Sequence, residues 1–299
     1  MSGEKNPVRV LVDYLEGEMP AVPLPAGVER SGLQYTGRSV IVTGGNKGMG
    51  EGIARVFVDA GADVLTCGRD VETGQNLASE LNQKGPGKCV FEPCDVSKPE
   101  NIRATVEKAV ECFGKLDCLV NNAGAHPPLA PFSEHSRDDL IDLMNTNFVS
   151  QFEFCRLAIE HLRKTKGNII NMSSCTAKLG QDGGAIYSAT KGAICSFTKS
   201  LAIEEAPHGV RVNCVLPGNI YTESRKQFVE SIGEHGADTD RWAEGLQPMG
   251  RSGTIEEAGQ VILFLASDAA SYLTGVELMI SAGIELGQGL KYPSLWTGP

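Results

Sequence analysis

From residue 38 onward, short apolar, β-branched segments alternate with longer segments of helical periodicity. The apolar segments lie near residues 38–43, 62–67, 88–92, 117–121, 167–172, 210–215 and 276–280, and the helical patterns near 49–59, 71–83, 99–113, 137–164, 184–206 and 254–266. Near-continuous apolar strands joined by helices are typical of a parallel sheet covered on both faces. With right-handed crossovers, this order predicts an α/β fold: a single doubly wound, Rossmann-type parallel sheet with its ligand at the carboxyl ends of the strands.

Residues 1–34 have a different character from the rest of the chain. Pro7, Pro20, Pro23 and Pro25 interrupt this stretch, and it shows no alternation of strand and helix. We expect an extended or partly ordered N-terminal extension, followed by one domain over residues 35–299.

Charge and cysteine usage exclude several classes of protein. A formal charge of −10 and a pI near 5.1 argue against a nucleic-acid surface. No apolar run is long enough to span a membrane, and the N-terminus lacks the basic and apolar regions of a secretory signal. The nine cysteines form no Cys-x-x-Cys pair and the five histidines show no ligand spacing, so we expect buried reduced thiols, no metal and a cytoplasmic location.

The segment 40–50 reads VIVTGGNKGMG, in which a strand runs into a glycine-rich turn and then into a helical pattern. This context is typical of a dinucleotide site. Glycines let the backbone approach a pyrophosphate, and the following helix N-terminus offers free N–H groups to it.

Tyr187 and Lys191 are four residues apart in a predicted helix and so lie on the same face. A nearby ammonium favours the phenolate, which suits a tyrosine to moving a proton to or from an alcohol oxygen. On its own this spacing is more often an exposed lysine beside a half-buried tyrosine.

Further motifs follow in a fixed order: LVNNAG at 119–124, IINMSS at 169–174 with Ser174 thirteen residues before Tyr187, and PGNIYT at 217–222. With these motifs the chain resembles the short-chain dehydrogenase/reductase family over roughly residues 36–287. The resemblance implies an oxidoreductase that transfers a hydride between a nicotinamide cofactor and a secondary alcohol or ketone. A dinucleotide-binding sensor or scaffold without turnover is the alternative.

Within the family, the segments NNAGAHPP and AGIELG are similar to members of the 17β-hydroxysteroid dehydrogenase type 14 group. This closer resemblance implies a hydroxysteroid or another hydrophobic carbonyl compound as the substrate. Substrates of the 3-oxoacyl and sugar-alcohol classes are alternatives, because fold does not choose among them.

The resemblance also implies roles for individual residues. Tyr187 would exchange the proton, Lys191 would lower the pKa of that tyrosine and hold the nicotinamide ribose, and Ser174 would bond the substrate oxygen. Asn147 would position a proton-relay water, with Asn145 as its competitor and Ser173 as the competitor of Ser174. The implied cofactor-binding residues are Gly44, Asn46, Lys47, Gly48, Met49, Gly50, Arg69, Asp95, Val96, Asn122, Ala123, Gly124, Tyr187, Lys191, Pro217, Gly218, Ile220 and Thr222.

The end of the second strand indicates which dinucleotide binds. An acid there would bond the ribose hydroxyls and repel a 2′-phosphate, but this chain has Gly68 followed by Arg69. Arg69 and Lys47 could bind that phosphate, so NADP(H) is preferred, although the type 14 enzyme carries the acid and uses NAD. Alternatively, both cations are solvated and Asp70 serves the ribose, which would leave NAD(H) as the cofactor.

Three features concern the substrate and assembly. His126 either faces the substrate or is a loop histidine held by the prolines after it. The resemblance implies that Asp95 borders the adenine. Alternatively, Asp95 caps the helix that begins near Pro99, although Ser97 is the better candidate for that cap. Residues 219–252 are expected to form a substrate lid whose apolar residues cover a hydrophobic molecule or pack on the body. The resemblance implies a homodimer or homotetramer formed through the helices near 137–164 and 184–206. The apolar lid residues are Phe228, Val229, Ile232, Trp242, Leu246 and Met249.

Overall fold

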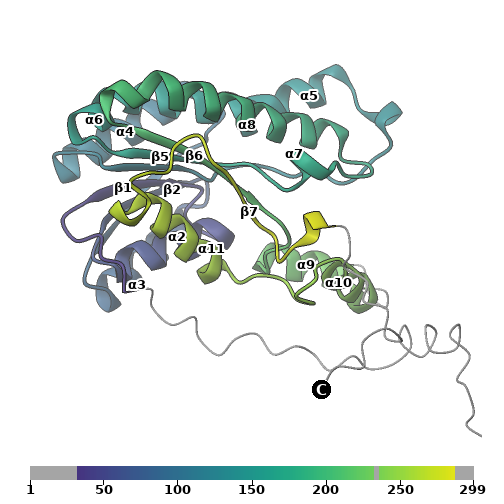
Figure 1. Ribbon diagram of the computed structural model, residues 1–299. Helices are drawn as coiled ribbons and strands as arrows, with labels where there is room; N and C mark the ends of the chain where they lie inside the picture. The colour runs from purple at the N-terminus through teal and green to yellow at the C-terminus, as the bar shows by residue number, and fades with distance from the viewer. Residues whose placement is uncertain (1–31, 232–235, 287–299) are drawn as a thin grey trace, which may run out of the picture.

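A seven-stranded parallel sheet forms the centre of the protein in a computed structural model that describes residues 32–231 and 236–286 (Figure 1). The strand order is β3-β2-β1-β4-β5-β6-β7. The doubly wound sheet predicted from the sequence is therefore confirmed, and each strand begins and ends close to its predicted segment. The strands are β1 Ser39–Thr43, β2 Asp63–Gly68, β3 Lys88–Pro93, β4 Cys118–Asn121, β5 Asn168–Met172, β6 Arg211–Pro217 and β7 Glu277–Ile280.

Helices pack on both faces of the sheet (Figure 1). On one face lie α2 (Gly48–Asp59), α3 (Val71–Lys84) and α11 (Ile255–Ala266), over a core that includes Val40, Phe57 and Ile262. The other face carries α4 (Pro99–Phe113), α6 (Ser150–Thr165) and α8 (Ala185–Glu205), over a second core that includes Ile41, Leu119 and Phe154. Burial on both faces explains why the strands read as continuous apolar runs.

Helices α2 and α11 approach each other through glycine. A Cβ atom on Gly52 would lie 2.4 Å from the carbonyl oxygen of Ile255, and one on Gly259 would lie 2.8 Å from the carbonyl oxygen of Gly52. Only a backbone without side chains allows this crossing.

Local signals set where the helices begin. Asp70 caps α3 by accepting from the backbone N–H of Thr73, and Thr254 and Glu257 form a capping box at the start of α11. Helix α4 differs from expectation, because Lys98 occupies its N-cap position and no side chain caps it. The prediction that Ser97 or Asp95 caps this helix is therefore wrong. Pro99 at the first helical position has no N–H group, so one fewer donor needs a partner there.

The continuous helix expected over 137–164 is interrupted. Helix α5 (Arg137–Met144) runs into a π-helical turn at Asn145–Val149 before α6 begins. A π-turn adds one residue to a helical turn without breaking the apolar pattern, and such turns are frequent at functional sites.

Short helices lie beside the carboxyl edge of the sheet, namely α7 (Thr176–Leu179), α9 (Glu223–Ser231) and α10 (Gly236–Gly245) (Figure 1). Helices α9 and α10 occupy the predicted lid. Its two ends are joined, because Tyr221 N–H donates to the carbonyl oxygen of Gly253 (2.7 Å) and Gly253 N–H donates to that of Asn219 (2.9 Å).

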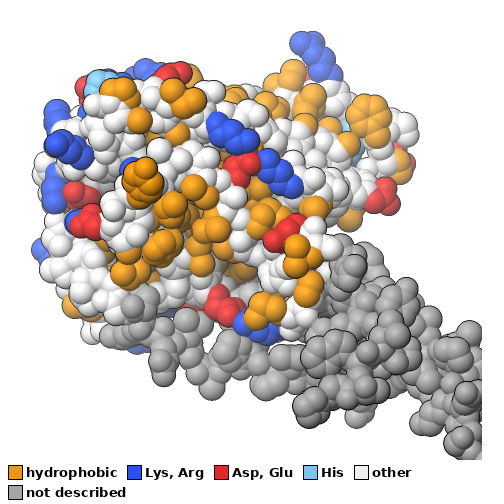
Figure 2. Space-filling view, in the orientation of Figure 1, with side chains coloured by type: hydrophobic (Ala, Val, Ile, Leu, Met, Phe, Trp, Pro, Cys, Tyr) orange, Lys and Arg blue, Asp and Glu red, His pale blue; other side chains and the backbone are white. Residues whose placement is uncertain are grey.

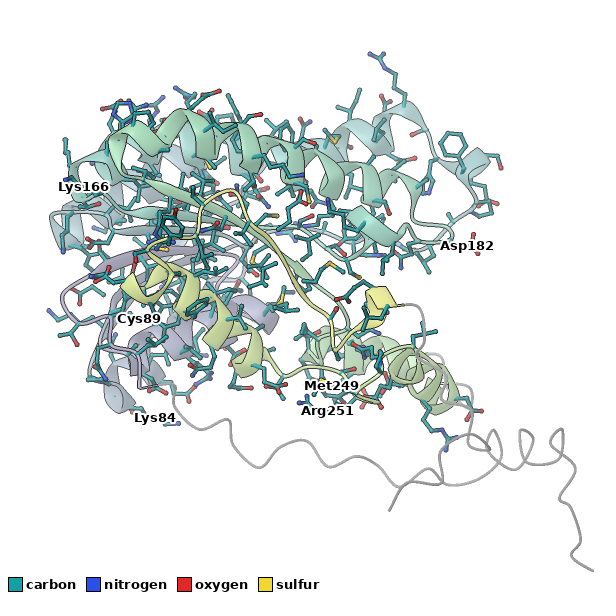
Figure 3. All side chains as sticks on the ribbon, viewed as in Figure 1. Lys84, Cys89, Lys166, Asp182, Met249 and Arg251 are labelled. Atoms are coloured by element: carbon teal, nitrogen blue, oxygen red, sulfur yellow. The ribbon has the colours of Figure 1, made fainter. Side chains whose placement is uncertain are left out.

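The apolar lid surface itself stays a prediction. Ile232 lies outside the described residues, as do the side chains of Phe228 and Trp242. Val229 and Leu246 are half-buried and Met249 is 58% exposed. Figure 3 shows Met249 and Arg251 at the base of the lid helices, and Asp182 on the loop after α7, on the other side of the carboxyl edge.

At the N-terminal side, Tyr35 is buried and packs edge-on against Phe57, with ring centroids 5.1 Å apart. Residues 1–31 of the expected extension lie outside the described residues. Within the part of the chain that the structure describes, no helix is long and apolar enough to cross a membrane. The same residues contain no group of three potential metal ligands, and the nine cysteines are free.

Candidate active site

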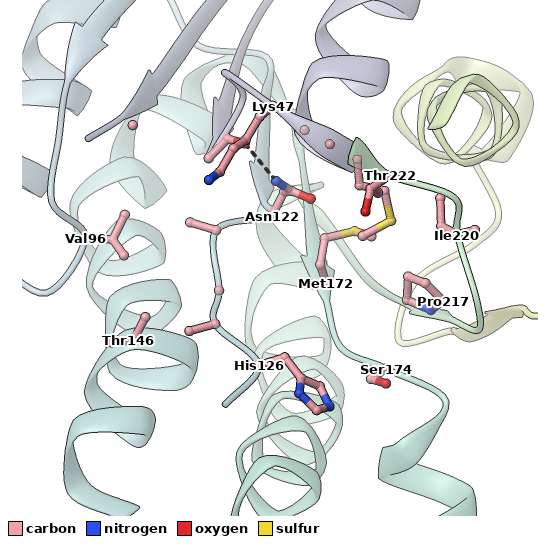
Figure 4. A pocket seen from close by; sticks show the side chains of 18 of the residues that line it. Lys47, Val96, Asn122, His126, Thr146, Met172, Ser174, Pro217, Ile220 and Thr222 are labelled. Carbon is pink, nitrogen blue, oxygen red and sulfur yellow. Dashed lines mark hydrogen bonds between the residues drawn. The ribbon is translucent and has the colours of Figure 1, made fainter. Parts of the chain in front are cut away.

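A cavity of about 800 Å³ opens along the carboxyl edge of the sheet. Strands β1 and β4 are neighbours at its centre, where the chain order reverses, and ligands of doubly wound sheets bind at this point. The cavity is lined by every site residue expected from the sequence except Asn147, which lies directly behind its wall. Figure 4 shows Lys47 toward one end of this pocket, His126 and Ser174 toward the other, and Asn122 between them.

The glycine-rich loop fits a dinucleotide pyrophosphate. Gly44 and Gly48 have φ angles of 63° and 56°, in the left-handed region that favours glycine. A Cβ atom on Gly50 would lie 2.1 Å from the carbonyl oxygen of Gly44, so the loop closes tightly here. Helix α2 begins at Gly48 without a side-chain cap, which leaves its first N–H groups for an anion.

Strand β4 is fastened to this loop through Asn122. Its backbone N–H donates to Thr43 Oγ1 (3.0 Å), and its Nδ2 donates to the carbonyl oxygen of Thr43 (2.9 Å). Ala123 N–H donates to the same hydroxyl at 2.9 Å. The Asn-Asn-Ala-Gly motif thus fixes the floor of the cavity by joining the ends of β1 and β4.

Tyr187 projects from the first turns of α8 toward Ser174, which follows β5. Burial raises the pKa of Tyr187, while a hydrogen bond with Ser174 acts in the opposite direction. The two hydroxyls can therefore meet one substrate oxygen, Ser174 by hydrogen bonding and Tyr187 by exchanging a proton.

Lys191 lies behind Tyr187, with its Nζ 5.6 Å from the centroid of the tyrosine ring. The Nζ donates to the carbonyl oxygen of Met172 at 3.0 Å. Burial lowers the pKa of Lys191 to about 8, so the lysine keeps its positive charge at neutral pH and loses it more readily than an exposed lysine as pH rises. The expected lowering of the Tyr187 pKa is accordingly not found, because burial of the phenol dominates.

Asn147 is presented by the π-helical turn and is fully buried. Its Oδ1 accepts from Ala125 N–H (2.7 Å), and its Nδ2 donates to the carbonyl oxygen of Ala125 (3.0 Å) and to Thr190 Oγ1 (3.1 Å). Asn145 is exposed instead, so the geometry favours Asn147 over its competitor.

The hydroxyl groups of Ser173 and Ser174 point in different directions and have different partners. The hydroxyl of Ser173 donates to the carbonyl oxygen of Lys191 at 2.7 Å and so holds α8 against β5. Ser174 Oγ accepts from Thr176 N–H at 3.2 Å and faces Tyr187. The geometry thus favours Ser174 as the residue that meets the substrate.

Comparison with known proteins agrees with this arrangement. A family model described as enoyl-(acyl carrier protein) reductase matches residues 44–285. An L-fucose dehydrogenase of Oryctolagus cuniculus is 44% identical over 259 residues, covering 87% of this chain and 89% of that protein. The chain belongs to the short-chain dehydrogenase/reductase family. It is therefore an oxidoreductase that acts on CH–OH groups, and the alternative of a non-catalytic sensor is set aside.

Two other similar proteins extend the comparison of this short-chain dehydrogenase/reductase. The 3-oxoacyl-[acyl-carrier-protein] reductase FabG of Chlamydia pneumoniae is 38% identical, covering 84% of this chain and 98% of that protein. The crystal structure of L-sorbose reductase from Gluconobacter frateurii, complexed with NADPH and L-sorbose, superposes with a TM-score of 0.81 at 27% identity. That match covers 84% of this chain and 98% of the reductase.

The end of the cavity beside β2 and β3 carries both signs of charge. Asp70 accepts from Thr73 N–H (3.1 Å) and Thr73 Oγ1 (2.8 Å), and Asp95 accepts from Ser97 N–H (3.0 Å) and Ser97 Oγ (2.8 Å). These bonds to local backbone N–H groups and hydroxyls lower the pKa of both carboxyl groups. Both carboxylates are thus engaged at their own turns, whereas Lys47 and Arg69 are exposed at the cavity wall.

His126 is held by the proline that follows it and also lines the cavity, while its role toward a substrate stays a prediction. Its Nδ1 lies 2.7 Å from the carbonyl oxygen of Pro127, so the following proline does hold it in place. Its ring packs on that of Tyr187 with centroids 4.2 Å apart, and its Nε2 lies 3.1 Å from Gln181 Oε1. The histidine therefore lines the cavity beside the reacting hydroxyls.

Three residues that line the cavity or contact its predicted residues were missed by sequence reasoning. Thr190 accepts from Asn147 Nδ2 and donates to the carbonyl oxygen of Tyr187 (2.8 Å), so it links two residues of the site. Gln181 reaches His126 from another loop. Arg225 lines the cavity from α9, where its Nε donates to Asp240 at 2.9 Å. Only Thr190 carried a signal, since it stands next to Lys191 on the same helix.

Proposed function

We propose that this short-chain dehydrogenase/reductase uses NADP(H) to interconvert a carbinol and a carbonyl group of a sugar or sugar alcohol. When bound, the nicotinamide supplies or accepts the hydride, and the protein manages the proton and the orientation. The substrate hydroxyl proton passes to or from Tyr187, and Ser174 Oγ bonds the oxygen on which negative charge develops.

The observation that carries the substrate class is His126, whose ring packs on that of Tyr187 and whose Nε2 contacts Gln181. The carbonyl of Pro127 only accepts, so His126 Nδ1 carries a proton. A neutral imidazole then accepts at Nε2 from the amide of Gln181, whereas an imidazolium donates to its oxygen. Either way, the imidazole stands beside Tyr187 at the cavity wall with the Gln181 amide bonded to it, and it can bond a second hydroxyl next to the reacting carbon, as a sugar provides and a steroid does not. The names of the L-fucose dehydrogenase and L-sorbose reductase relatives support this proposal.

The cofactor preference rests on the adenosine end. Arg69 and Lys47 are exposed there, while both nearby carboxylates are engaged by their own turns. A 2′-phosphate gains charge-assisted bonds in such a setting. The NADPH in the sorbose reductase structure supports the same assignment.

Nicotinamide absorbance with purified protein tests the substrate class. The panel contains aldoses including L-fucose, sugar alcohols, a 17β-hydroxysteroid as the closer resemblance suggests, and a 3-oxoacyl thioester, each with NADP(H) and NAD(H). We expect turnover of a sugar or polyol with NADP(H). Turnover confined to the steroid or the thioester overturns the sugar assignment and leaves the family unchanged.

Two substitutions separate the parts of the proposal. Gln181→Leu should raise the KM of the sugar about tenfold, because it removes the amide that holds the His126 ring in place beside the substrate. Arg69→Ala should weaken NADPH binding far more than NADH binding, since only NADPH carries the 2′-phosphate. Equal effects of Arg69→Ala on both dinucleotides would contradict the NADP(H) preference.

We also propose a homodimer or homotetramer in a reducing compartment, the cytoplasm. Val149 and Phe152 on the α6 side are 43% and 42% exposed, and Phe152 packs on Phe197 of α8 with centroids 6.0 Å apart. Apolar side chains also gather over β7 and α11 on the face shown in Figure 2. Patches of this kind mark interfaces, and nine free thiols suit reducing conditions. Sedimentation equilibrium tests the assembly, and a monomer at micromolar concentration would contradict it.

A further inference from the structure

Arg225 is a basic residue that reaches the cavity from the lid rather than from the sheet. It lies in the first turn of α9, lines the cavity, and its side chain is only 15% exposed. The other basic side chains that line the cavity have different places. Lys47 and Arg69 lie at the glycine-rich loop and after the end of β2, and Lys191 lies behind Tyr187. The hydride and proton steps described above do not use Arg225.

The start of α9 lies against the glycine-rich loop. A Cβ atom on Gly48 would lie 3.6 Å from Thr222 Cγ2, so Thr222 is within ordinary contact distance of the residue at which α2 begins. Thr222 Oγ1 in turn accepts from Arg225 N–H at 3.2 Å, as the capping residue of a helix does. Figure 4 shows Thr222 toward the same end of the pocket as Lys47. The backbone of Arg225 is thereby fixed next to the loop that fits a pyrophosphate.

Asp240 of α10 holds the guanidinium group of Arg225. The Nε and Nη2 atoms of the arginine donate to the same carboxylate oxygen, Oδ1, at 2.9 Å and 2.5 Å. The two side chains are 15% and 22% exposed, so both charges are partly withdrawn from water and each compensates for the other. A guanidinium has five N–H donors, and Asp240 needs only two of them. The same group can therefore bind a second acceptor.

A pyrophosphate beside the loop is a suitable second acceptor. Each of its phosphates carries a negative charge, whereas the backbone N–H groups at the start of α2 offer only partial positive charges. A guanidinium supplies a full positive charge and a planar set of donors that matches phosphate oxygens. Because α9 begins beside Gly48, Arg225 can contact the pyrophosphate on the side opposite the loop.

We propose that Arg225 binds the pyrophosphate of the dinucleotide from the lid side of the cavity, with Asp240 as the residue that positions it. The glycine-rich loop and the lid then hold the same group between them. This inference goes beyond the choice of NADP(H) and of a sugar substrate, because both dinucleotides contain the pyrophosphate. Arg225 should matter equally for NADPH and NADH, whereas Arg69 should matter for NADPH alone.

The experiment measures dissociation constants of NADPH, NADH and ADP-ribose by titration calorimetry. ADP-ribose keeps the pyrophosphate and lacks the nicotinamide. Arg225→Met should weaken binding of each ligand about tenfold or more, because it removes a charged donor to a phosphate. Arg225→Lys keeps the charge without the planar set of donors and should lose less. Asp240→Asn keeps an oxygen that accepts from Arg225 and removes the opposing charge, so affinities should stay unchanged or rise a few-fold.

Arg241→Met is the matched control. Arg241 also lies in the lid, on α10, but it is 52% exposed, pairs with Asp238 of its own helix and lies outside the lining of the cavity. The control removes the same charge from the same part of the protein, so it should change each dissociation constant by less than about twofold. Thermal melting of each variant without ligand confirms folding.

The outcomes are distinct. Dissociation constants of Arg225→Met within twofold of the wild type would overturn the proposal. Equal weakening by Arg225→Met and Asp240→Asn would also overturn it, because the ion pair would then serve only to join α9 and α10. Weaker binding of NADPH and NADH with unchanged binding of ADP-ribose would overturn it by placing Arg225 at the nicotinamide. A wild type that prefers NADH, with equal losses of both dinucleotides in Arg225→Met, would overturn the NADP(H) assignment and support the role of Arg225.

Discussion

Replacing Lys191 by methionine should make the protein more stable while abolishing its activity. The lysine is fully buried, and burial lowers its pKa from 10.5 to about 8. At about 1.4 kcal/mol per pKa unit, holding the charged form in the folded state at pH 7 costs about 3 kcal/mol. Methionine has a similar length and no charge. Loss of the hydrogen bond to the carbonyl oxygen of Met172 destabilises the variant by about 1 kcal/mol. The free energy of unfolding of the variant should therefore exceed that of the wild type by about 2 kcal/mol.

The pH dependence tests the origin of this gain. Below pH 8 the lysine is charged in both the folded and the unfolded wild type, so the full cost is present. Above pH 10.5 it is neutral in both states, and the cost disappears. The stability difference between Lys191→Met and wild type should therefore be largest near pH 7 and shrink as pH rises from 8 to 10.5.

Chemical denaturation at pH 7 and at pH 10.5, at one protein concentration and without cofactor, measures this difference. Lys164→Met removes an exposed lysine near the end of α6 and should change stability by less than about 0.5 kcal/mol at either pH. A Lys191→Met variant less stable than wild type at pH 7, or a difference that does not change with pH, would refute the reasoning.

Three further substitutions test the site and its support. Tyr187→Phe should keep dinucleotide binding but lower turnover by roughly 10²–10⁴-fold, and near-normal turnover would exclude its proton transfer. Thr190→Val should lower turnover and shift its pH profile, because Asn147 loses a hydrogen bond. Thr190→Ser keeps the hydroxyl and should restore both turnover and pH profile. Equal behaviour of the two variants would leave no role for the hydroxyl. Gly52→Ala should destabilise the fold by about 1–3 kcal/mol through its clash with Ile255, measured by denaturation. Gly192→Ala in α8 is its control: no atom lies within 4 Å of the new Cβ, so this variant should be neutral or stabilising, and equal losses from both would contradict the packing argument.

Local sequence contained most of the fold. Strands such as β1 and β5 are buried on both faces, so their apolar composition alone indicated them. The starts of α4 and α11 are marked by local residues, namely Pro99 at the first helical position and the Thr254–Glu257 capping box. The π-helical turn around Asn147 could not be seen, because inserting one residue leaves the apolar pattern readable as one helix.

Some residues of the candidate site could likewise be predicted from local sequence, and others could not. Its predicted residues occur in motifs whose spacing is local, and the strand order brings these motifs to one cavity. The place of Gln181 depends instead on its contact with His126, which joins segments far apart in sequence. The pKa of Tyr187 was mistaken for a related reason: proximity to a cation was visible in the sequence, but burial of the phenol was not.

The hydrogen-bonded ends of the lid have an evolutionary consequence. Asn219 and Tyr221 are tied to Gly253, so the segment between them leaves the body and returns at nearly the same point. An insertion, deletion or exchange of that segment then leaves the sheet register, the glycine-rich loop and the Tyr187 helix in place. The segment between Asn219 and Gly253 can thus be exchanged as one unit. Grafting the corresponding segment of another family member between these two anchor points should transfer substrate preference without rebuilding the catalytic residues.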